Sequence, residues 1–322
     1  MVGVWWQFRH PQMFTSKCKV RKNLALASFM TQPDYLMLGH FTRDVLPDGT
    51  TTPGGTSLYA ALTAHHLGRN VGVVSAPAEL PIGWPDTIQI VFHPSPAPPT
   101  FENRYTLEGR EQTLHTASQP ITLEVIPEAW QTAPLIHLGP VLGETPEQLV
   151  DAFPGALLGV TPQGWMRAWN EPLPGPVLYR SWQPTPRVLE RIDALVLSIE
   201  DVLGNEALVA DYARHCALVA LTRGAQGSTL FLHGVPHHIP AFPAIERDPT
   251  GAGDVFAAAL LVRLRETGDP LDAARFASYV AARSVEGAGI SRIPARGEIE
   301  QGLTMQDRIK EAALGSEQGL PL

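Results

Sequence analysis

The chain has 322 residues, of which 44% are hydrophobic and 17% are charged, and its formal net charge is −8. This is the balance of a folded protein with a sizeable core, and it excludes the disordered and collagen-like classes. No apolar run reaches the length of a membrane span, and the two cysteines, Cys18 and Cys216, give neither a disulfide framework nor a metal-ligand spacing. We therefore expect a soluble, cytoplasmic protein without a membrane partner.

Charge is distributed unevenly along the chain. Residues 1–30 hold five basic residues and no acidic one. The remaining 19 basic residues face 32 acidic ones, a net charge of −13, which argues against nucleic acid as a partner. We interpret residues 1–30 as a basic extension outside the folded domain. It is either a transit peptide or, as the abrupt change in lysine usage favours, the product of a start assigned upstream of Met30.

From Met30 onward, short apolar runs alternate with helical patterns, which is typical of βαβ units and a mostly parallel sheet. The predicted fold class is α/β, a three-layer α/β/α sandwich. The predicted strands are 35–38, 71–74, 135–138, 156–160, 194–199, 217–222 and 228–232. The predicted helices are 57–67, 146–153, 206–215, 254–265 and 271–284.

Residues 88–121 interrupt this rhythm. Prolines at 94, 96, 98 and 99 precede two strand-like runs that are joined by a turn at Glu108–Gly109. The segment predicts a small β-hairpin or sheet inserted in the α/β scaffold, either a lid over a site or a decorated loop. We expect one domain over 31–302 that includes this lid, and a peripheral C-terminal tail over 303–322.

The helix predicted over 57–67 is preceded by a candidate binding motif. Asp44 lies a short distance before Gly54 and Gly55, which stand at the start of this helix. A carboxylate accepts hydrogen bonds from two neighbouring hydroxyls, and glycine lets the backbone approach a polyol closely. The alternative is an ordinary capped helix with a surface aspartate.

The helix predicted over 254–265 follows the motif Asp248-Pro-Thr-Gly-Ala-Gly-Asp254. The backbone N–H groups of Gly251, Ala252 and Gly253 stand at a helix N-terminus, where unpaired donors and the helix dipole favour an anion such as phosphate. Asp254 lies beside this seat and can accept the proton of an attacking hydroxyl. The alternative is that Asp254 is only a helix cap and the glycines a tight turn.

These two motifs resemble those of the ribokinase-like (PfkB) carbohydrate kinases. In that family the last aspartate of D-x-T-G-A-G-D is the catalytic base and the G-A-G backbone is the anion hole. The resemblance therefore implies these roles for Asp254 and residues 251–253. It also implies that Asp44 and the pair at 54–55 bind the hydroxyls of the acceptor.

The acceptor end departs from the pattern of many sugar kinases. Tyr59 stands where they have asparagine, which puts ribose in doubt, and the stretch around Asn103 resembles the inositol-kinase-like branch. Residues 161–167, Thr-Pro-Gln-Gly-Trp-Met-Arg, resemble the D-P-Q-G-x-x-R stretch of that branch, with Thr161 in place of the aspartate. Gln163 and Arg167 either line the acceptor pocket or only shape a turn.

The nucleotide half of the family pattern is present with substitutions. Ser198-Ile-Glu-Asp201 occupies the place of the N-x-x-E motif, so Asp201 is implied to organise Mg²⁺ through water, with Glu200 as a rival. Residues 221–228 resemble the T-x-G-x-x-G turn that lies along the nucleotide. The implied nucleotide-binding residues are Ser198, Thr222, Arg223, Gly224, Gly227 and Thr250.

The function implied is transfer of the γ-phosphoryl group of ATP to a hydroxyl of a small sugar or polyol, with an inositol-like acceptor favoured. The alternatives are a nucleoside kinase of the same fold and a catalytically silent nucleotide or sugar sensor. The implied cofactors are ATP and Mg²⁺, with a monovalent cation left open. The expected partners are ATP and a small hydroxyl acceptor, and monomer and homodimer remain open alike.

Overall fold

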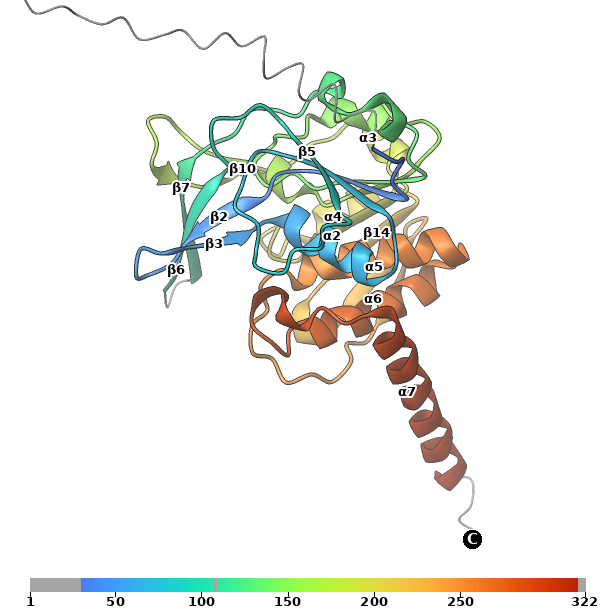
Figure 1. The fold of residues 1–322 in the computed structure, drawn as a ribbon. Helices are drawn as coiled ribbons and strands as arrows, with labels where there is room; N and C mark the ends of the chain where they lie inside the picture. The colour runs from blue at the N-terminus through green and yellow to red at the C-terminus, as the bar shows by residue number, and fades with distance from the viewer. Residues whose placement is uncertain (1–29, 107–108, 318–322) are drawn as a thin grey trace, which may run out of the picture. The chain divides into compact units, whose positions relative to one another are not determined.

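A nine-stranded main sheet runs through the structure, a computed structural model that describes residues 30–106 and 109–317 (Figure 1). Seven of its strands, β5, β4, β1, β8, β9, β13 and β14, run parallel to one another. The last two, β15 and β16, pair antiparallel. The order is β16 (Val235–Ile239), β15 (Ser228–Leu232), β14 (Leu218–Thr222), β13 (Ala194–Ser198), β9 (Leu157–Val160), β8 (Leu135–Leu138), β1 (Tyr35–Leu38), β4 (Val71–Ser75) and β5 (Gln89–Phe92).

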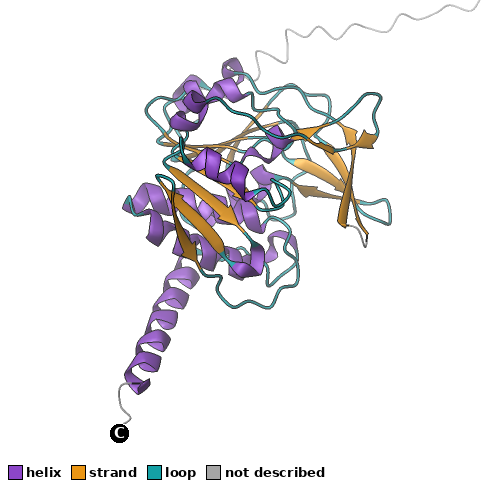
Figure 2. Cartoon of the chain, turned by 180° about the vertical axis from the view of Figure 1, so that it is seen from behind, coloured by secondary structure: helices purple, strands orange, loops and turns teal. Residues whose placement is uncertain are grey.

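Helices cover both faces of this sheet (Figure 2). On one face α2 (Thr56–His66), α5 (Ala252–Thr267) and α6 (Pro270–Ser284) share a buried core with alternate strand residues, such as Met37 and Val196. On the other face lie α3 (Pro186–Arg191) and α4 (Glu206–Ala213), whose buried side chains fall outside that core. The predicted three-layer α/β/α class is confirmed.

A second sheet, the lid sheet, has five strands (Figure 2). Its order is β11 (Gly175–Pro176), β7 (Gly109–Thr116), β6 (Thr100–Thr106), β2 (Thr42–Val45) and β3 (Thr51–Gly54). A short antiparallel pair, β10 (Arg167–Ala168) with β12 (Leu178–Tyr179), lies in the same stretch of chain as β11. The lid sheet is therefore assembled from segments that are far apart in the sequence.

The lid differs from the insertion expected over 88–121. Its hairpin, β6 and β7, is present, and the expected turn at Glu108–Gly109 lies partly outside the described residues. The first strand of the segment, β5, instead extends the main sheet by pairing with β4. β2 and β3 join the lid by pairing with each other and with β6. The expected boundaries of the lid, 88 and 121, were therefore wrong. Local sequence patterns do not encode pairing between strands that are far apart in the sequence.

Two expected helical boundaries also differ. Residues 146–153 were expected to form a helix, and the structure has a 3₁₀ turn, η3 (Glu147–Asp151), instead. Pro154 follows closely, and the residue before a proline avoids the α conformation. The helix α7 begins at Arg296 and ends at Glu317, so the expected boundary at 302 falls inside it. The other 3₁₀ turns are η1 (Leu123–Val125), η2 (Glu128–Trp130), η4 (Pro162–Met166), η5 (Gly224–Gln226) and η6 (Gly289–Arg292).

Local hydrogen bonds mark the starts of the two C-terminal helices. Asp269 caps α6 by accepting hydrogen bonds from the N–H groups of Leu271 and Asp272. Glu298 of α7 accepts one from the N–H of Ala295, just before the helix. Even the longer helices are interrupted by polar residues, and none within residues 30–106 and 109–317 has the length and apolar character needed to cross a membrane.

Candidate active site

Three strands of the main sheet end in polar residues at the same edge. Thr161 follows β9, Ser198 ends β13 and Thr222 ends β14. The carboxyl ends of parallel strands lie at one edge of a sheet, where ligands of α/β folds commonly bind. All three residues line one cavity of about 1940 Å³, which also includes the N-terminus of α5 and part of the lid sheet. This cavity is the candidate active site.

The N-terminus of α5 opens into the cavity. Gly251 caps the helix with a φ of 77°, in the left-handed region, and a Cβ there would overlap the ring of Tyr59. Both constraints require glycine. Within the described chain, no backbone carbonyl accepts a hydrogen bond from the N–H groups of Gly251, Gly253 or Asp254. These donors and the helix dipole form a seat for an anion.

Ala252 differs from its expected role in that seat. Its N–H donates to the carbonyl of Pro249 at 3.1 Å and so closes a turn rather than pointing to a ligand. The N–H of Gly253, by contrast, donates to no backbone carbonyl of the described chain, and the place of a Cβ at Gly253 has nothing within 4 Å. The seat is therefore formed by Gly251, Gly253 and Asp254.

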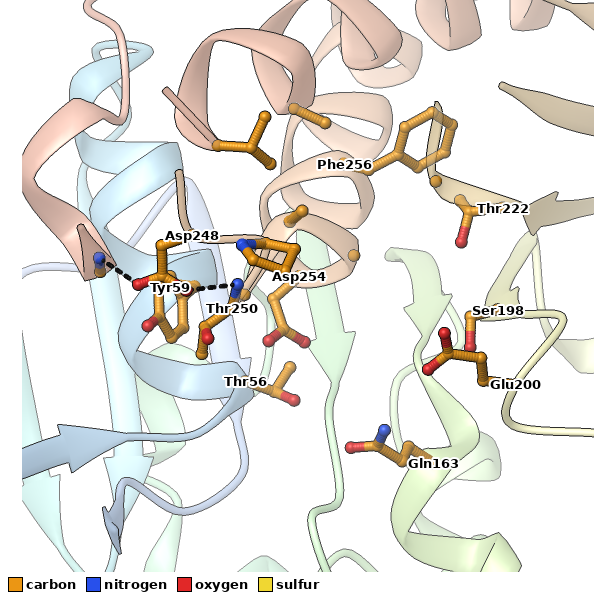
Figure 3. Close-up of a pocket in the computed structure, with 18 of the residues that line it drawn as sticks. Thr56, Tyr59, Gln163, Ser198, Glu200, Thr222, Asp248, Thr250, Asp254 and Phe256 are labelled. Atoms are coloured by element: carbon orange, nitrogen blue, oxygen red, sulfur yellow. Dashed lines mark hydrogen bonds between the residues drawn. The ribbon is translucent and has the colours of Figure 1, made fainter. Parts of the chain in front are cut away.

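Asp254 lies deep in the cavity, where solvent still reaches it partly. Figure 3 shows its carboxylate directed toward Thr56, with Ser198, Glu200 and Thr222 across the cavity. Desolvation raises the pKa of Asp254 to about 6, against the lowering effects of the Thr56 hydroxyl and of the positive charge of Arg167. A carboxylate with such a pKa is ionised at neutral pH and is basic enough to accept a proton.

Asp248, at the start of the same motif, holds the loop in place. Its carboxylate accepts from the N–H of Thr250 at 3.0 Å and from the N–H of Gly289 at 2.7 Å, as the dashed lines in Figure 3 show. Burial raises the pKa of Asp248, but these hydrogen bonds outweigh it and hold the pKa below its usual value. Asp248 therefore ties the loop before α5 to the turn before α7.

The lid end of the cavity contains the motif near the start of the chain. Asp44 of β2 and Gly55 line the cavity, whereas Gly54 is not among its lining residues. A Cβ at Gly54 would overlap the Asp44 carboxylate, and one at Gly55 would lie 2.8 Å from the Cγ2 of Thr42. The two glycines therefore let the start of α2 pack directly against β2.

Other expected lid-end residues also line the cavity. Asn103 of β6 accepts a hydrogen bond from the Nε2 of Gln112 on β7 at 2.8 Å. Arg167 donates to the carbonyl of Val141 at 2.8 Å, and its guanidinium lies 5.6 Å from the centre of the Phe101 ring. These contacts join the segment after β9 to the lid sheet.

Tyr59 of α2 lines the cavity between the lid end and the seat at α5. Its burial and the negative charges of Asp254, Asp248 and Asp44 raise the pKa of its hydroxyl. Tyr59 is therefore a neutral hydrogen-bonding group at neutral pH.

The opposite, turn end of the cavity is lined by Thr222, Gly224 and Gly227, as the sequence predicts. Thr250 also lines the cavity near the seat at α5. Beyond the turn, the wall is largely apolar. Its apolar residues include Phe242, Ala244, Phe256, Ala281, Val285 and Ile290.

Arg223 is not among the residues that line the cavity. Its guanidinium pairs with Glu206 at 3.0 Å and donates to the hydroxyl of Thr229 at 2.8 Å. Arg223 thus braces the turn from outside, and the charge expected to meet a ligand is used within the protein. The local sequence did not reveal Glu206, because it comes from the neighbouring helix α4.

Ser198, Glu200 and Asp201 form a polar corner after β13. The Asp201 carboxylate accepts from the N–H of Ser198 at 2.7 Å and from the Nε2 of Gln163 at 3.1 Å. The Ser198 hydroxyl in turn accepts from the N–H of Asp201 at 3.1 Å. Asp201 therefore stabilises the turn, while the exposed Glu200 projects into the cavity (Figure 3).

Oxygen atoms at this corner suit Mg²⁺, which binds through one or two carboxylates and completes its shell with water and phosphate. Over the described residues there is no group of three or more His, Cys, Asp or Glu side chains that could hold a metal by themselves. The corner thus fits an ion held jointly with a phosphate ligand.

Most of the site residues expected from the sequence line the cavity, but other lining residues were not expected. Thr56 stands at a helix start, Gln112 is in a strand and Asp248 opens the loop before α5, and the local sequence gives none of them a role in the site. The apolar wall gave no signal, because Phe242, Ala281 and Val285 come from separate segments.

The comparisons with known proteins agree with the fold. Residues 196–296 match the model of the pfkB family carbohydrate kinases. A solved structure of a pyrophosphate-dependent kinase in the ribokinase family, complexed with a pyrophosphate analog and myo-inositol, has a TM-score of 0.68 and 24% identity. The match covers 83% of this chain and 99% of that one. The resemblance to the ribokinase-like (PfkB) carbohydrate kinases is therefore confirmed.

Two curated relatives are kinases of a polyol and a sugar. Inositol 3-kinase of Zea mays is 32% identical over 156 residues, which are 47% of this chain and 39% of the relative. Fructokinase of Klebsiella pneumoniae is 36% identical over 110 residues, which are 32% of this chain and 36% of the relative. The chain thus matches less than half the length of either relative.

Proposed function

We propose that the chain is an ATP-dependent kinase that transfers the γ-phosphoryl group to a hydroxyl of a small sugar or polyol, with an inositol-like acceptor favoured. The main support is Asp254, a carboxylate with a pKa of about 6 at the N-terminal turn of α5. It lies in the same cavity as a polar lid end and an apolar turn end. This arrangement suits proton removal from an alcohol beside a bound phosphate.

The roles follow from position. Asp44, Gly55, Asn103, Gln163 and Arg167 bind the acceptor at the lid end. Asp254 takes the proton of the attacking hydroxyl. The N–H groups of the α5 terminus stabilise the negative charge of the phosphoryl group during transfer. Closure of the lid sheet over the cavity excludes water, which limits hydrolysis of the phosphoryl donor.

The turn end favours a nucleotide as donor. Phe242, Ala281 and Val285 offer apolar contacts to a base beyond the Thr222–Gly227 turn. Inorganic pyrophosphate has no group that would use this wall. Among residues 30–322 there is one lysine, Lys310, so the phosphates rely on arginine, backbone donors and metal. These features support ATP over the pyrophosphate used by the similar solved structure.

We propose that Glu200, Ser198 and Asp201 hold Mg²⁺, Asp201 through water, together with the ATP phosphates. When bound, Mg²⁺ neutralises part of the phosphate charge. Glu200 is the best placed, because its carboxylate has no hydrogen-bond partner in the described structure, whereas both oxygens of Asp201 already accept one.

The test is a coupled assay of the purified full chain with Mg-ATP or Mg-pyrophosphate and a panel of acceptors. The panel contains myo-inositol, fructose, ribose and cytidine, and K⁺ is exchanged for Na⁺ to detect a monovalent-ion requirement. We expect acceptor-dependent ADP release with myo-inositol or a sugar. Activity with pyrophosphate alone would refute the donor assignment, and turnover of cytidine alone would identify a nucleoside kinase.

The silent-sensor alternative makes a distinct prediction in the same experiment. A silent sensor would bind ATP, which calorimetry measures, but would release no ADP with any of the acceptors. Sedimentation analysis of the same sample distinguishes monomer from homodimer, both of which are compatible with the proposed reaction. A cytoplasmic site of action remains our proposal, and fractionation of cells that express the full chain tests it.

A further inference from the structure

A chain of three hydrogen-bonded side chains leads from the core to the cavity. The hydroxyl of Tyr35, on β1, lies 2.6 Å from the Nδ1 of His137, on β8. The Nε2 of His137 lies 3.1 Å from the Oγ1 of Thr161, just after β9. Tyr35 and His137 are fully buried, and Thr161 lines the cavity.

Burial fixes the direction of the hydrogen bond between Tyr35 and His137. Among the described residues, the Tyr35 hydroxyl has no partner other than the Nδ1 of His137. If Nδ1 carried the hydrogen, the tyrosine hydrogen would be buried without an acceptor, which is strongly disfavoured. Tyr35 therefore donates, and Nδ1 accepts.

The imidazole then has its hydrogen on Nε2. Burial lowers the pKa of His137 to about 3, so the ring is neutral and carries one N–H at neutral pH. Because Nδ1 is the acceptor, Nε2–H donates to the Oγ1 of Thr161. Thr161 receives a hydrogen bond from the core and does not need to donate one back.

The hydroxyl hydrogen of Thr161 is consequently available to the cavity. Thr161 shares this cavity with Gln163, Arg167 and Asp254. The position thus presents a neutral donor, whereas the aspartate of the inositol-kinase-like stretch would present an acceptor. With threonine in place of aspartate, the position therefore donates a hydrogen bond to a ligand instead of accepting one.

We infer that Thr161 is a specificity-determining residue that donates its hydroxyl hydrogen to an oxygen of the acceptor substrate, and that Tyr35 and His137 are positioning residues that fix this direction. The inference rests on the proposed kinase function for the identity of the ligand. The geometry of the three side chains is independent of that function. The selected acceptor presents a lone pair, from a hydroxyl, ring ether or carbonyl oxygen, at this point.

The first test reads the histidine directly and needs no activity. Nitrogen chemical shifts of the full chain with ¹⁵N-labelled histidine report the tautomer, and the signal that disappears in His137→Gln is assigned to His137. We expect a neutral ring protonated on Nε2 throughout pH 5–8. A ring protonated on Nδ1 would overturn the inference, because Thr161 would then donate to His137.

The second test is kinetic and uses the acceptor that gives ADP release. Thr161→Val keeps the shape but removes the hydroxyl, so we expect KM for the acceptor to rise about tenfold while KM for ATP stays within about twofold. Thr161→Ser should restore most of the acceptor affinity. Tyr35→Phe should raise the KM for the acceptor by a smaller factor. Without the Tyr35 hydroxyl, nothing fixes which of His137 and Thr161 donates the hydrogen bond between them.

Thr145→Val is the matched control, since it removes a buried hydroxyl that has no hydrogen-bond partner among the described residues and lies outside the cavity. It should leave both KM values unchanged. If the wild type is active and Thr161→Val leaves the KM for the acceptor unchanged, this inference is overturned but the proposed function is not. If the wild type releases no ADP with any acceptor, the proposed function fails, and the tautomer measurement still decides the direction.

Discussion

Asp254 is held in a state that weakens folding at neutral pH. Its folded-state pKa of about 6 lies above the value of 3.8 expected for an exposed aspartate. The protonated form is therefore favoured by folding, a contribution that is complete below pH 3.8 and lost as the pH rises through 6. The maximum effect is about 3 kcal/mol, and the water that reaches the cavity reduces it.

Asp254→Asn should accordingly stabilise the protein at pH 8. We expect the free energy of unfolding to rise by about 1–2 kcal/mol relative to the wild type, because the uncharged amide avoids the desolvation of the carboxylate. Urea unfolding at pH 8 and at pH 4.5 measures it, and the difference should shrink at the lower pH. A variant that is less stable than the wild type at pH 8 would contradict this account of the pKa.

The same pKa predicts an acidic limb in the rate profile. As the base becomes protonated below pH 6, kcat/KM should fall about tenfold per pH unit. Arg167→Gln removes a positive charge that lowers the pKa of Asp254, so the midpoint of the limb should move to higher pH. A midpoint that stays in place, measured from kcat/KM against pH, would show that another group controls the limb.

Gly251 cannot be replaced without strain. Gly251→Ala meets an unfavourable φ of 77° and overlaps the ring of Tyr59, so we expect a loss of about 1–3 kcal/mol in unfolding free energy. Gly253→Ala adds the same methyl group to open space and should keep the wild-type stability. Thermal unfolding of both variants makes the comparison, and equal losses would contradict it.

At the scale of elements, the start of α6 offers a test that is separate from the cavity. Asp269 accepts hydrogen bonds from the N–H groups of Leu271 and Asp272. Asp269→Ala should lower the unfolding free energy by about 1 kcal/mol, whereas Asp269→Asn should retain most of it, since the amide oxygen still accepts. Chemical unfolding of the pair checks this, and equal losses in the two variants would contradict the capping role of the side chain.

The elements show what the sequence could and could not predict. Apolar runs located seven of the nine main-sheet strands, because a buried strand of this sheet is mostly apolar, whereas the half-exposed edge strands β5 and β16 were missed. The N-terminus of α5 was evident from its small residues and acidic first turn. The lid was only partly predicted, since β2 and β3 join it through pairing with β6, and Thr42–Val45 has no distinctive local pattern. The partners of Asp201 and Arg223 come from other segments and have no local signal: Gln163 donates to the Asp201 carboxylate, and Glu206 pairs with Arg223.

At the scale of the whole molecule, the acidic character of residues 31–322 limits how phosphate can be held. A net charge of −13 and a single lysine leave the ligand charge to arginine, metal and the donors of α5. Arg167 reaches the cavity, while Arg223 is already paired. The proposed reaction therefore depends on one arrangement, with Asp254 and the N-terminus of α5 between the two ends of the cavity.

The most direct test of that arrangement compares wild type and Asp254→Asn under one set of conditions, with ATP binding followed by calorimetry and acceptor-dependent ADP release followed at saturating substrates. We expect the variant to bind ATP with an affinity within a few-fold of the wild type and to lose a factor of at least about 10² in kcat, because the proton of the attacking hydroxyl has no acceptor. An Asp254→Asn protein that binds ATP and retains wild-type kcat would contradict the central claim.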